Sequence, residues 1–145
     1  MNCTRLALAA VAGTVFDACY GVTVYGMLLA PEFAKYPGVY RAADVGPSYL
    51  PLMFAGILLA VAVVTVIYAK GYEGRGAGEG VRFGALVAAF GTCAFSGVNY
   101  ATLNIGRRFA LEIAAAGFVE WFLIGVIVAA VYKPSQAAAA KPAGV

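Results

Sequence analysis

The fold is decided by an unbroken apolar run at residues 49–69, which reads YLPLMFAGILLAVAVVTVIYA and contains no charged side chain. A helix of about 20 residues crosses the roughly 30 Å of hydrocarbon in a bilayer. Three more runs of similar length lie on either side of it, so the four cover residues 6–29, 49–69, 83–105 and 109–132. The sequence therefore predicts an all-α integral membrane bundle of four transmembrane helices.

The composition also indicates that the chain lies in a lipid bilayer. Of the 145 residues, 63% are hydrophobic and 12% are charged, whereas a soluble domain has about 25% charged residues. Such a chain has too little polar surface to cover a globule in water, so the lipid bilayer is its expected partner. The net charge of +3 comes from basic residues that stand singly or in pairs between the apolar runs. They are typical of membrane flanks, and no nucleic-acid partner is expected.

The chain is predicted to be one domain. Residues 1–133 hold the four spans, and residues 134–145 form a low-complexity tail of Ala, Pro and Lys that has no core to fold around. A cleaved signal peptide would need an uninterrupted apolar stretch, but Asp17 interrupts the first run. We therefore interpret residues 6–29 as a retained span.

The three connections differ in composition. Residues 31–47 mix aromatic and charged side chains, which predicts a loop at the level of the lipid headgroups. Residues 70–80 read KGYEGRGAGEG and predict a flexible link. This link follows a membrane helix and has no Gly-Lys-Ser/Thr, so we do not interpret it as a nucleotide site. Residues 104–108 predict a tight hairpin in which Gly106 ends the preceding helix.

The distribution of basic residues favours both termini in the cytoplasm. With the N-terminus inside, six basic residues are cytoplasmic: Arg5, Lys70, Arg75, Arg82, Lys133 and Lys141. Four are then outside: Lys35, Arg41, Arg107 and Arg108. This excess agrees with the positive-inside rule.

No catalytic signature is present in the sequence. The chain has no histidine, and its three cysteines, Cys3, Cys19 and Cys93, lack the spacing of a metal site. Imidazole-ligated haem, imidazole metal ligands and histidine acid–base chemistry are thereby excluded. We expect no metal, no cofactor and no enzymatic activity.

Two acidic residues lie in the middle of predicted spans, Asp17 in the first and Glu120 in the fourth. A charge at that depth costs about 2.5–3.5 kcal/mol, so both should face the bundle interior. Either the two carboxyls are close and at least one is protonated, or each makes its own hydrogen bonds, within the chain or to another subunit. Candidate partners for the second arrangement are Thr14, Tyr20, Ser96 and Asn99. We favour proximity, because both acids lie at one depth beside small residues.

Further polar residues could extend a pocket around these acids. With the N-terminus inside, Tyr25 and the other candidates fall in the outer half of the membrane, and the predicted pocket comprises Asp17, Glu120, Asn99, Tyr100, Glu112, Tyr20 and Asn104. The alternative is that the Ser, Thr and Asn side chains only join helices. Glu112 is also four residues from Arg108, the spacing of a surface ion pair. The second span offers only Thr65 and Tyr68, so we expect it to pack outermost.

Several segments together resemble a group of small bacterial four-helix membrane proteins of unknown function. They are YLPLMFAG at 49–56, IYAKGYEG at 67–74, GVRFG at 80–84, Asn99-Tyr100 and VEWFLIG at 119–125. The resemblance covers residues 30–133. It implies a four-helix fold in the bacterial inner membrane, and it implies no activity and no site residues.

Two functions fit these observations. The first is a non-enzymatic accessory or structural subunit of a larger bacterial membrane complex, because so small a bundle has few faces to bury its polar stripe. Its partners would be other membrane subunits or copies of itself. The second is a small proton-coupled transporter or solute binder that uses a polar pocket around Asp17 and Glu120.

Overall fold

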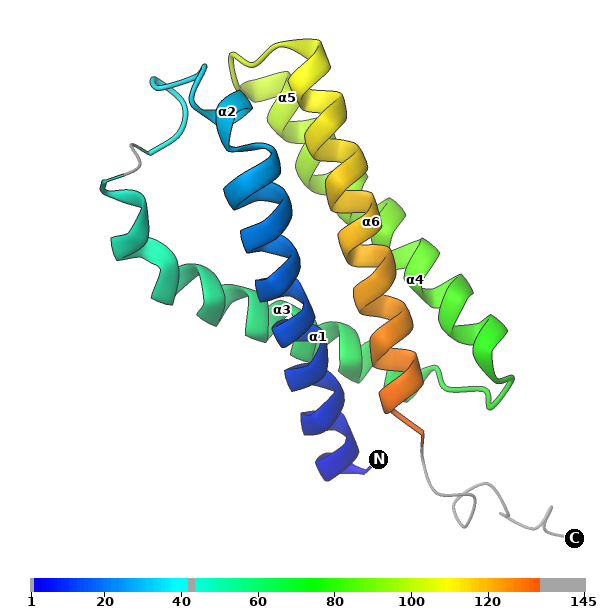
Figure 1. Cartoon of the computed structure of the whole chain (residues 1–145). Helices are drawn as coiled ribbons and strands as arrows, with labels where there is room; N and C mark the ends of the chain where they lie inside the picture. The colour runs from blue at the N-terminus through cyan, green and yellow to red at the C-terminus, as the bar shows by residue number, and fades with distance from the viewer. Residues whose placement is uncertain (1, 42–43, 134–145) are drawn as a thin grey trace, which may run out of the picture.

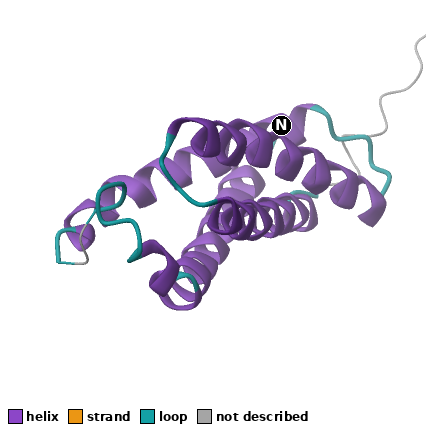
Figure 2. Cartoon of the chain, turned by 90° about the horizontal axis from the view of Figure 1, so that it is seen from above, coloured by secondary structure: helices purple, strands orange, loops and turns teal. Residues whose placement is uncertain are grey.

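The computed structural model describes residues 2–41 and 44–133, so the predicted tail lies outside the described residues. Helix α1 (Cys3–Thr23) continues as the π-helical turn η1 (Val24–Leu28), and the short α2 (Ala30–Phe33) follows. The turn η2 (Gly46–Tyr49) leads into α3 (Leu50–Lys70). Helix α4 (Ala77–Gly91) continues through the π-helical turn η3 (Thr92–Gly97) into α5 (Val98–Thr102), and α6 (Arg107–Val131) comes last. The described part holds helices and loops but no strand (Figures 1 and 2).

The four predicted spans are confirmed as helices that are long and apolar enough to cross a membrane. They extend over Cys3–Leu28, Gly46–Lys70, Ala77–Thr102 and Arg107–Val131. Each begins earlier than the apolar run that predicted it, because polar flanking residues also adopt helical backbone. At the first helix, for example, the Asn2 side chain accepts a hydrogen bond from the backbone N–H of Arg5 at 3.2 Å, a typical N-cap.

Helices α4 and α6 pack at backbone distance. A Cβ atom added to Gly84 would lie 2.5 Å from the Phe122 carbonyl oxygen, and one added to Gly125 would lie 2.5 Å from Cα of Gly84. A Cβ on Gly80 would meet that of Ala129 at 2.7 Å. Small residues therefore allow the two helices to touch along one face, and Figure 1 shows them side by side.

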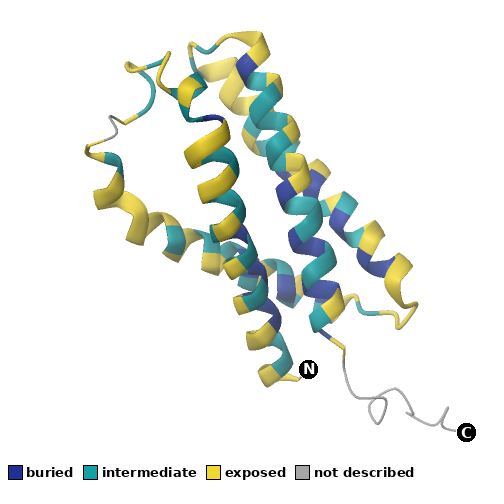
Figure 3. Cartoon of the chain, in the orientation of Figure 1, coloured by how far each residue is buried: buried dark blue, intermediate teal, exposed yellow. Residues whose placement is uncertain are grey.

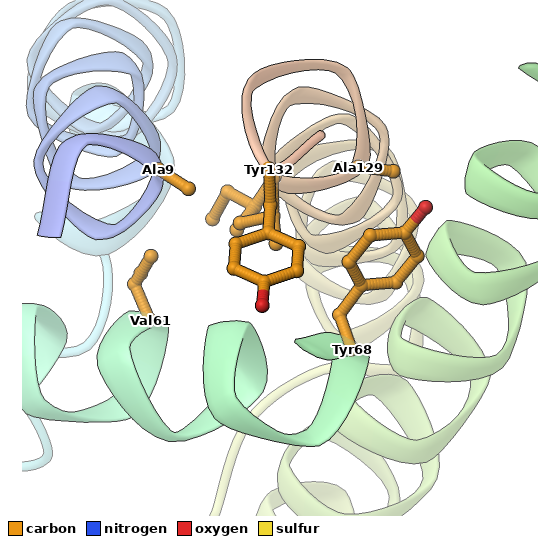
Figure 4. Packing of buried hydrophobic residues seen from close by; sticks show 7 residues of the cluster. Ala9, Val61, Tyr68, Ala129 and Tyr132 are labelled. Atoms are coloured by element: carbon orange, nitrogen blue, oxygen red, sulfur yellow. The ribbon is translucent and has the colours of Figure 1, made fainter. Parts of the chain in front are cut away.

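Helix α3 crosses α1 and α6 at one end of the molecule. The core lies at this crossing and contains Ala9 of α1, Val61 and Tyr68 of α3, and Ile124, Val128, Ala129 and Tyr132 (Figure 4). A Cβ on Gly13 would lie 2.7 Å from Cγ1 of Val61, so glycine lets α1 approach α3 here. Beyond the crossing the N-terminal half of α3 diverges from α1, and much of it is exposed (Figure 3). The expected outer position of the second span therefore holds for this half only, because Val61, Thr65 and Tyr68 are buried at the crossing.

The loop after α1 packs on the N-terminal end of α6. Phe109 is almost fully buried beneath three rings, one at the end of α2 and two in the loop that follows it. Tyr36 stacks on it with ring centroids 5.1 Å apart, and Phe33 and Tyr40 meet it edge-on. The aromatic residues that predicted a headgroup-level loop therefore also close one end of the bundle.

The prediction for Gly106 is wrong in one respect. Helix α5 ends at Thr102 with Leu103 in extended backbone, and Gly106 instead precedes α6 with φ −68° and ψ 146°. Its N–H donates to the Tyr36 hydroxyl at 3.0 Å, and a Cβ would lie 2.8 Å from that oxygen. The glycine is needed for this close approach of Tyr36, and its backbone needs no left-handed conformation.

The glycine-rich link is shorter and better ordered by hydrogen bonds than its composition predicted. Helix α4 already begins at Ala77, so Glu79 lies in its first turn. The Glu79 carboxylate is buried and accepts hydrogen bonds from the backbone N–H groups of Glu73 and Arg75, both at 2.9 Å. Tyr68 also hydrogen-bonds to it. Glu79 thus ties the link to its own helix.

Candidate binding cavity

A large cavity opens where α1 and α3 diverge. It has a volume of about 980 Å³, and one side is formed by the second half of α1 and by η1. The N-terminal half of α3 forms the facing side, and α6 contributes Glu120 and Trp121. Side chains between Ala30 and Arg41, together with Gly46, supply the remaining wall. The volume is in the range of small-molecule sites in proteins. The cavity exists because α1 and α3 touch only at their crossing.

The two mid-span acids meet at this cavity. Asp17 is 5% exposed and Glu120 is 7% exposed, and both line the cavity wall. Their side chains are within hydrogen-bonding contact of each other. Helices α1 and α6 are direct neighbours, so the predicted proximity of the two acids is present in the structure. A hydrogen bond between two carboxyls requires a proton on at least one of them.

Two tyrosines of the first span donate hydrogen bonds to α6, and one of them reaches the carboxyl pair. The Tyr25 hydroxyl donates to Oε2 of Glu120 at 2.9 Å, and the Tyr20 hydroxyl donates to the Ala116 carbonyl at 2.9 Å. Gly117 lies beside this hydroxyl, and a Cβ there would make an ordinary contact of 3.7 Å with the phenol oxygen. Tyr25 lies in the π-helical turn η1. Such turns occur often at functional sites because they change the direction of the side chains that follow.

The rest of the cavity wall is mainly apolar. Its side chains include Val22 of α1, Met53, Phe54 and Ile57 of α3, and Trp121. Trp121 also packs on Gly91 of α4, where a Cβ would lie 3.4 Å from the indole ring. The Trp121 indole therefore contacts α4 and also lines the cavity.

A cation lies at the other end of the cavity wall. Arg41 lines the cavity, and its guanidinium lies over the Tyr49 ring, 3.6 Å from the centroid, which is a cation–π contact. Tyr40 lines the same end; burial, together with the neighbouring Tyr36, raises the pKa of its phenol. Because Tyr40 stays neutral, Arg41 is the charged group at this end.

No family model, no curated protein and no solved structure matches this chain. The family resemblance and its implications remain predictions.

Five of the predicted pocket residues do not line the cavity, and Tyr20 is one of them because its hydroxyl is directed to the Ala116 carbonyl. Asn99, Tyr100 and Asn104 are exposed at the end of the third helical segment and in the turn that follows. Glu112 is half-buried and pairs with Arg108 at 2.9 Å, the surface ion pair that its spacing predicted. The predicted topology puts these residues in the outer half of the membrane, next to the mid-span acids, but Asn99, Tyr100 and Asn104 follow a helix that packs on the far side of α6 from the cavity.

Two further residues, Thr14 and Ser96, were predicted as hydrogen-bond partners of the acids. The Thr14 hydroxyl donates to the Ala10 carbonyl of its own helix at 2.9 Å and is not a partner of the acids. Ser96 does not line the cavity.

The sequence did not predict Arg41 or the α3 wall as parts of the site, because no pattern distinguishes them. Arg41 lies in a loop of mixed composition, and the α3 residues resemble any lipid-facing run. Among the described residues, no group of three acidic, histidine or cysteine side chains could hold a metal.

Proposed function

We propose that this chain is an integral protein of a bacterial inner membrane, with both termini in the cytoplasm. The four long apolar helices, the excess of basic residues on the N-terminal side and the resemblance support this placement. In this orientation the cavity lies in the outer half of the membrane. Labelling of exposed Cys3 with an impermeant maleimide, in a variant with Cys19→Ser and Cys93→Ser, tests the topology. If Cys3 is labelled in intact spheroplasts and not in inverted vesicles, the N-terminus lies outside and the proposed orientation is wrong.

Within that membrane, the protein acts as a non-enzymatic binder of a small, largely apolar solute. The observation that carries this proposal is the cavity of about 980 Å³ with the Asp17–Glu120 pair in its wall. Buried acids are costly in lipid and are seldom kept without a role. Most of the wall is apolar and a few polar groups converge on one place, which is the usual composition of a ligand site.

The single tryptophan of the chain gives a direct test, because Trp121 lines the cavity. Protein in nanodiscs is titrated with anthracene probes, which accept energy from an excited indole. A bound probe should produce a saturable loss of Trp121 emission above the linear background from probe dissolved in lipid. The three probes are anthracenylmethylamine, anthracenylmethanol and anthracene carboxylate, which share one apolar body.

A pair of glycine variants supplies the control. Gly21 lines the cavity and a Cβ there meets no atom within 4 Å, so Gly21→Leu should place its side chain in the cavity. Gly56 of α3 is equally open but does not line the cavity. Saturable quenching should disappear in Gly21→Leu and persist in Gly56→Leu. If none of the three probes quenches saturably in the wild-type protein, the binding function is wrong.

A second function, that of an accessory subunit or homo-oligomer, is supported by a different observation. Asn99 and Tyr100 are exposed within the third apolar helix, and polar side chains in membrane spans commonly join neighbouring helices. Purification through an N-terminal tag from native membranes tests this role. Recovery of the protein as a monomer alone would exclude both a complex and an oligomer.

A further inference from the structure

The charge balance of the cavity indicates what kind of solute it accepts. The Asp17 and Glu120 carboxyls lie in hydrogen-bonding contact, and two like charges in a dry site cannot both be ionised without a counter-charge. None of the described ion pairs involves either acid. Their hydrogen-bonding neighbour is the neutral phenol of Tyr25, with Tyr20 beside it. A cation is the group that would allow both carboxyls to ionise together.

The side chains of the site are a poor match for a divalent metal ion as that cation. The described residues provide two carboxyls and a phenol here but no third acidic ligand. A divalent ion such as Ca²⁺ takes six to eight oxygen ligands, and Mg²⁺ requires a near-octahedral set. The cavity is also far larger than one ion, and Phe54, Ile57 and Trp121 give it an apolar wall. The cation should therefore carry an apolar body.

The opposite end of the cavity limits the number of positive charges. Arg41 lines that end and α3 contributes no charged side chain to the wall. A second cationic group on the ligand would meet the guanidinium, which disfavours it. A single ammonium group next to the acids and an uncharged body toward Arg41 match both ends of the cavity.

From this juxtaposition we infer that the ligand class is a hydrophobic monoamine, bound as its ammonium ion by Asp17 and Glu120. The inference rests on the proposed binding function. An ammonium N–H group donates to each carboxylate, and these charge-assisted hydrogen bonds are stronger than neutral ones. Tyr25 holds Glu120 from the opposite helix, so it positions the acceptor and does not replace it.

The experiment compares the three anthracene probes by the same Trp121 emission assay. The amine should bind more tightly than the alcohol by about tenfold, and the carboxylate should bind most weakly. In the Asp17→Asn, Glu120→Gln variant the amine should lose about tenfold in affinity while the alcohol is unchanged. The amide variants keep the shape of each side chain, and circular dichroism with size-exclusion chromatography confirms that each variant is folded.

Glu112→Gln is the matched control, because Glu112 lies on the same helix and outside the cavity. It should leave amine binding unchanged. Equal binding of amine and alcohol, or amine binding that survives loss of both acids, would overturn the inference while leaving the binding function in place. Tightest binding of the carboxylate would also overturn it and would identify Arg41 as the polar contact. If none of the three probes quenches Trp121 emission saturably, the proposed binding function itself is wrong.

Discussion

Replacing Gly125 by alanine should separate α4 from α6. The new Cβ would lie 2.5 Å from Cα of Gly84 and 3.0 Å from its backbone nitrogen. Carbon atoms normally approach to about 3.5–4.0 Å, so the helices must move apart by about 1 Å. Both contacted atoms belong to the backbone, and no side-chain rotation can relieve the clash.

The magnitude follows from two opposing terms. Overpacking a tight interior costs about 1–3 kcal/mol, and a backbone clash belongs at the upper end of that range. Alanine also favours the helix over glycine by about 1 kcal/mol. The free energy of unfolding of Gly125→Ala should therefore fall by about 2 kcal/mol.

The matched control is Gly56→Ala, because a Cβ at Gly56 meets no atom within 4 Å. This variant gains only the helix propensity and should be about 1 kcal/mol more stable than wild type. The two variants thus differ by about 3 kcal/mol, a factor of about a hundred in the folding equilibrium. Unfolding in mixed micelles of a mild detergent and SDS, followed by circular dichroism, measures this difference. Equal midpoints for the two variants would refute the backbone contact between α4 and α6.

Two side-chain predictions concern the loops. Glu79→Gln leaves one oxygen to accept two backbone N–H groups, so stability should fall by about 1–3 kcal/mol and amide exchange at residues 71–76 should accelerate. Glu73→Gln, which changes only a surface ion pair, should match wild type; equal exchange in the two variants would contradict the role of Glu79. Tyr36→Phe removes the acceptor of the Gly106 N–H and should cost about 0.5–1 kcal/mol. Unchanged exchange at the Gly106 amide would show that this hydrogen bond is not formed.

Sequence patterns predicted the helices well because hydrophobic length is a local property. A run such as residues 49–69 specifies its own helix wherever its neighbours lie. The boundaries were less well predicted, since hydropathy marks the apolar part of a helix and polar caps such as Asn2 extend it. Gly106 shows a related limit. A glycine after a helix usually ends it, but here the Tyr36 hydroxyl from a distant loop requires the missing side chain.

The candidate site, too, was determined partly by local sequence and partly by the tertiary structure. The sequence by itself determined that Asp17 and Glu120 must face the bundle interior, because an unpaired charge that faces lipid costs free energy. It could not determine which polar residues contact the two acids, since a similar depth in the membrane does not place two helices side by side. Only the tertiary structure decided that α1 packs on α6, that Tyr25 rather than Asn99 reaches the acids, and that Arg41 faces the same space. The cavity itself results from one crossing at Gly13 and Val61, from which α3 diverges. The angle between two helices depends on how their surfaces interlock, and neither helix encodes that alone.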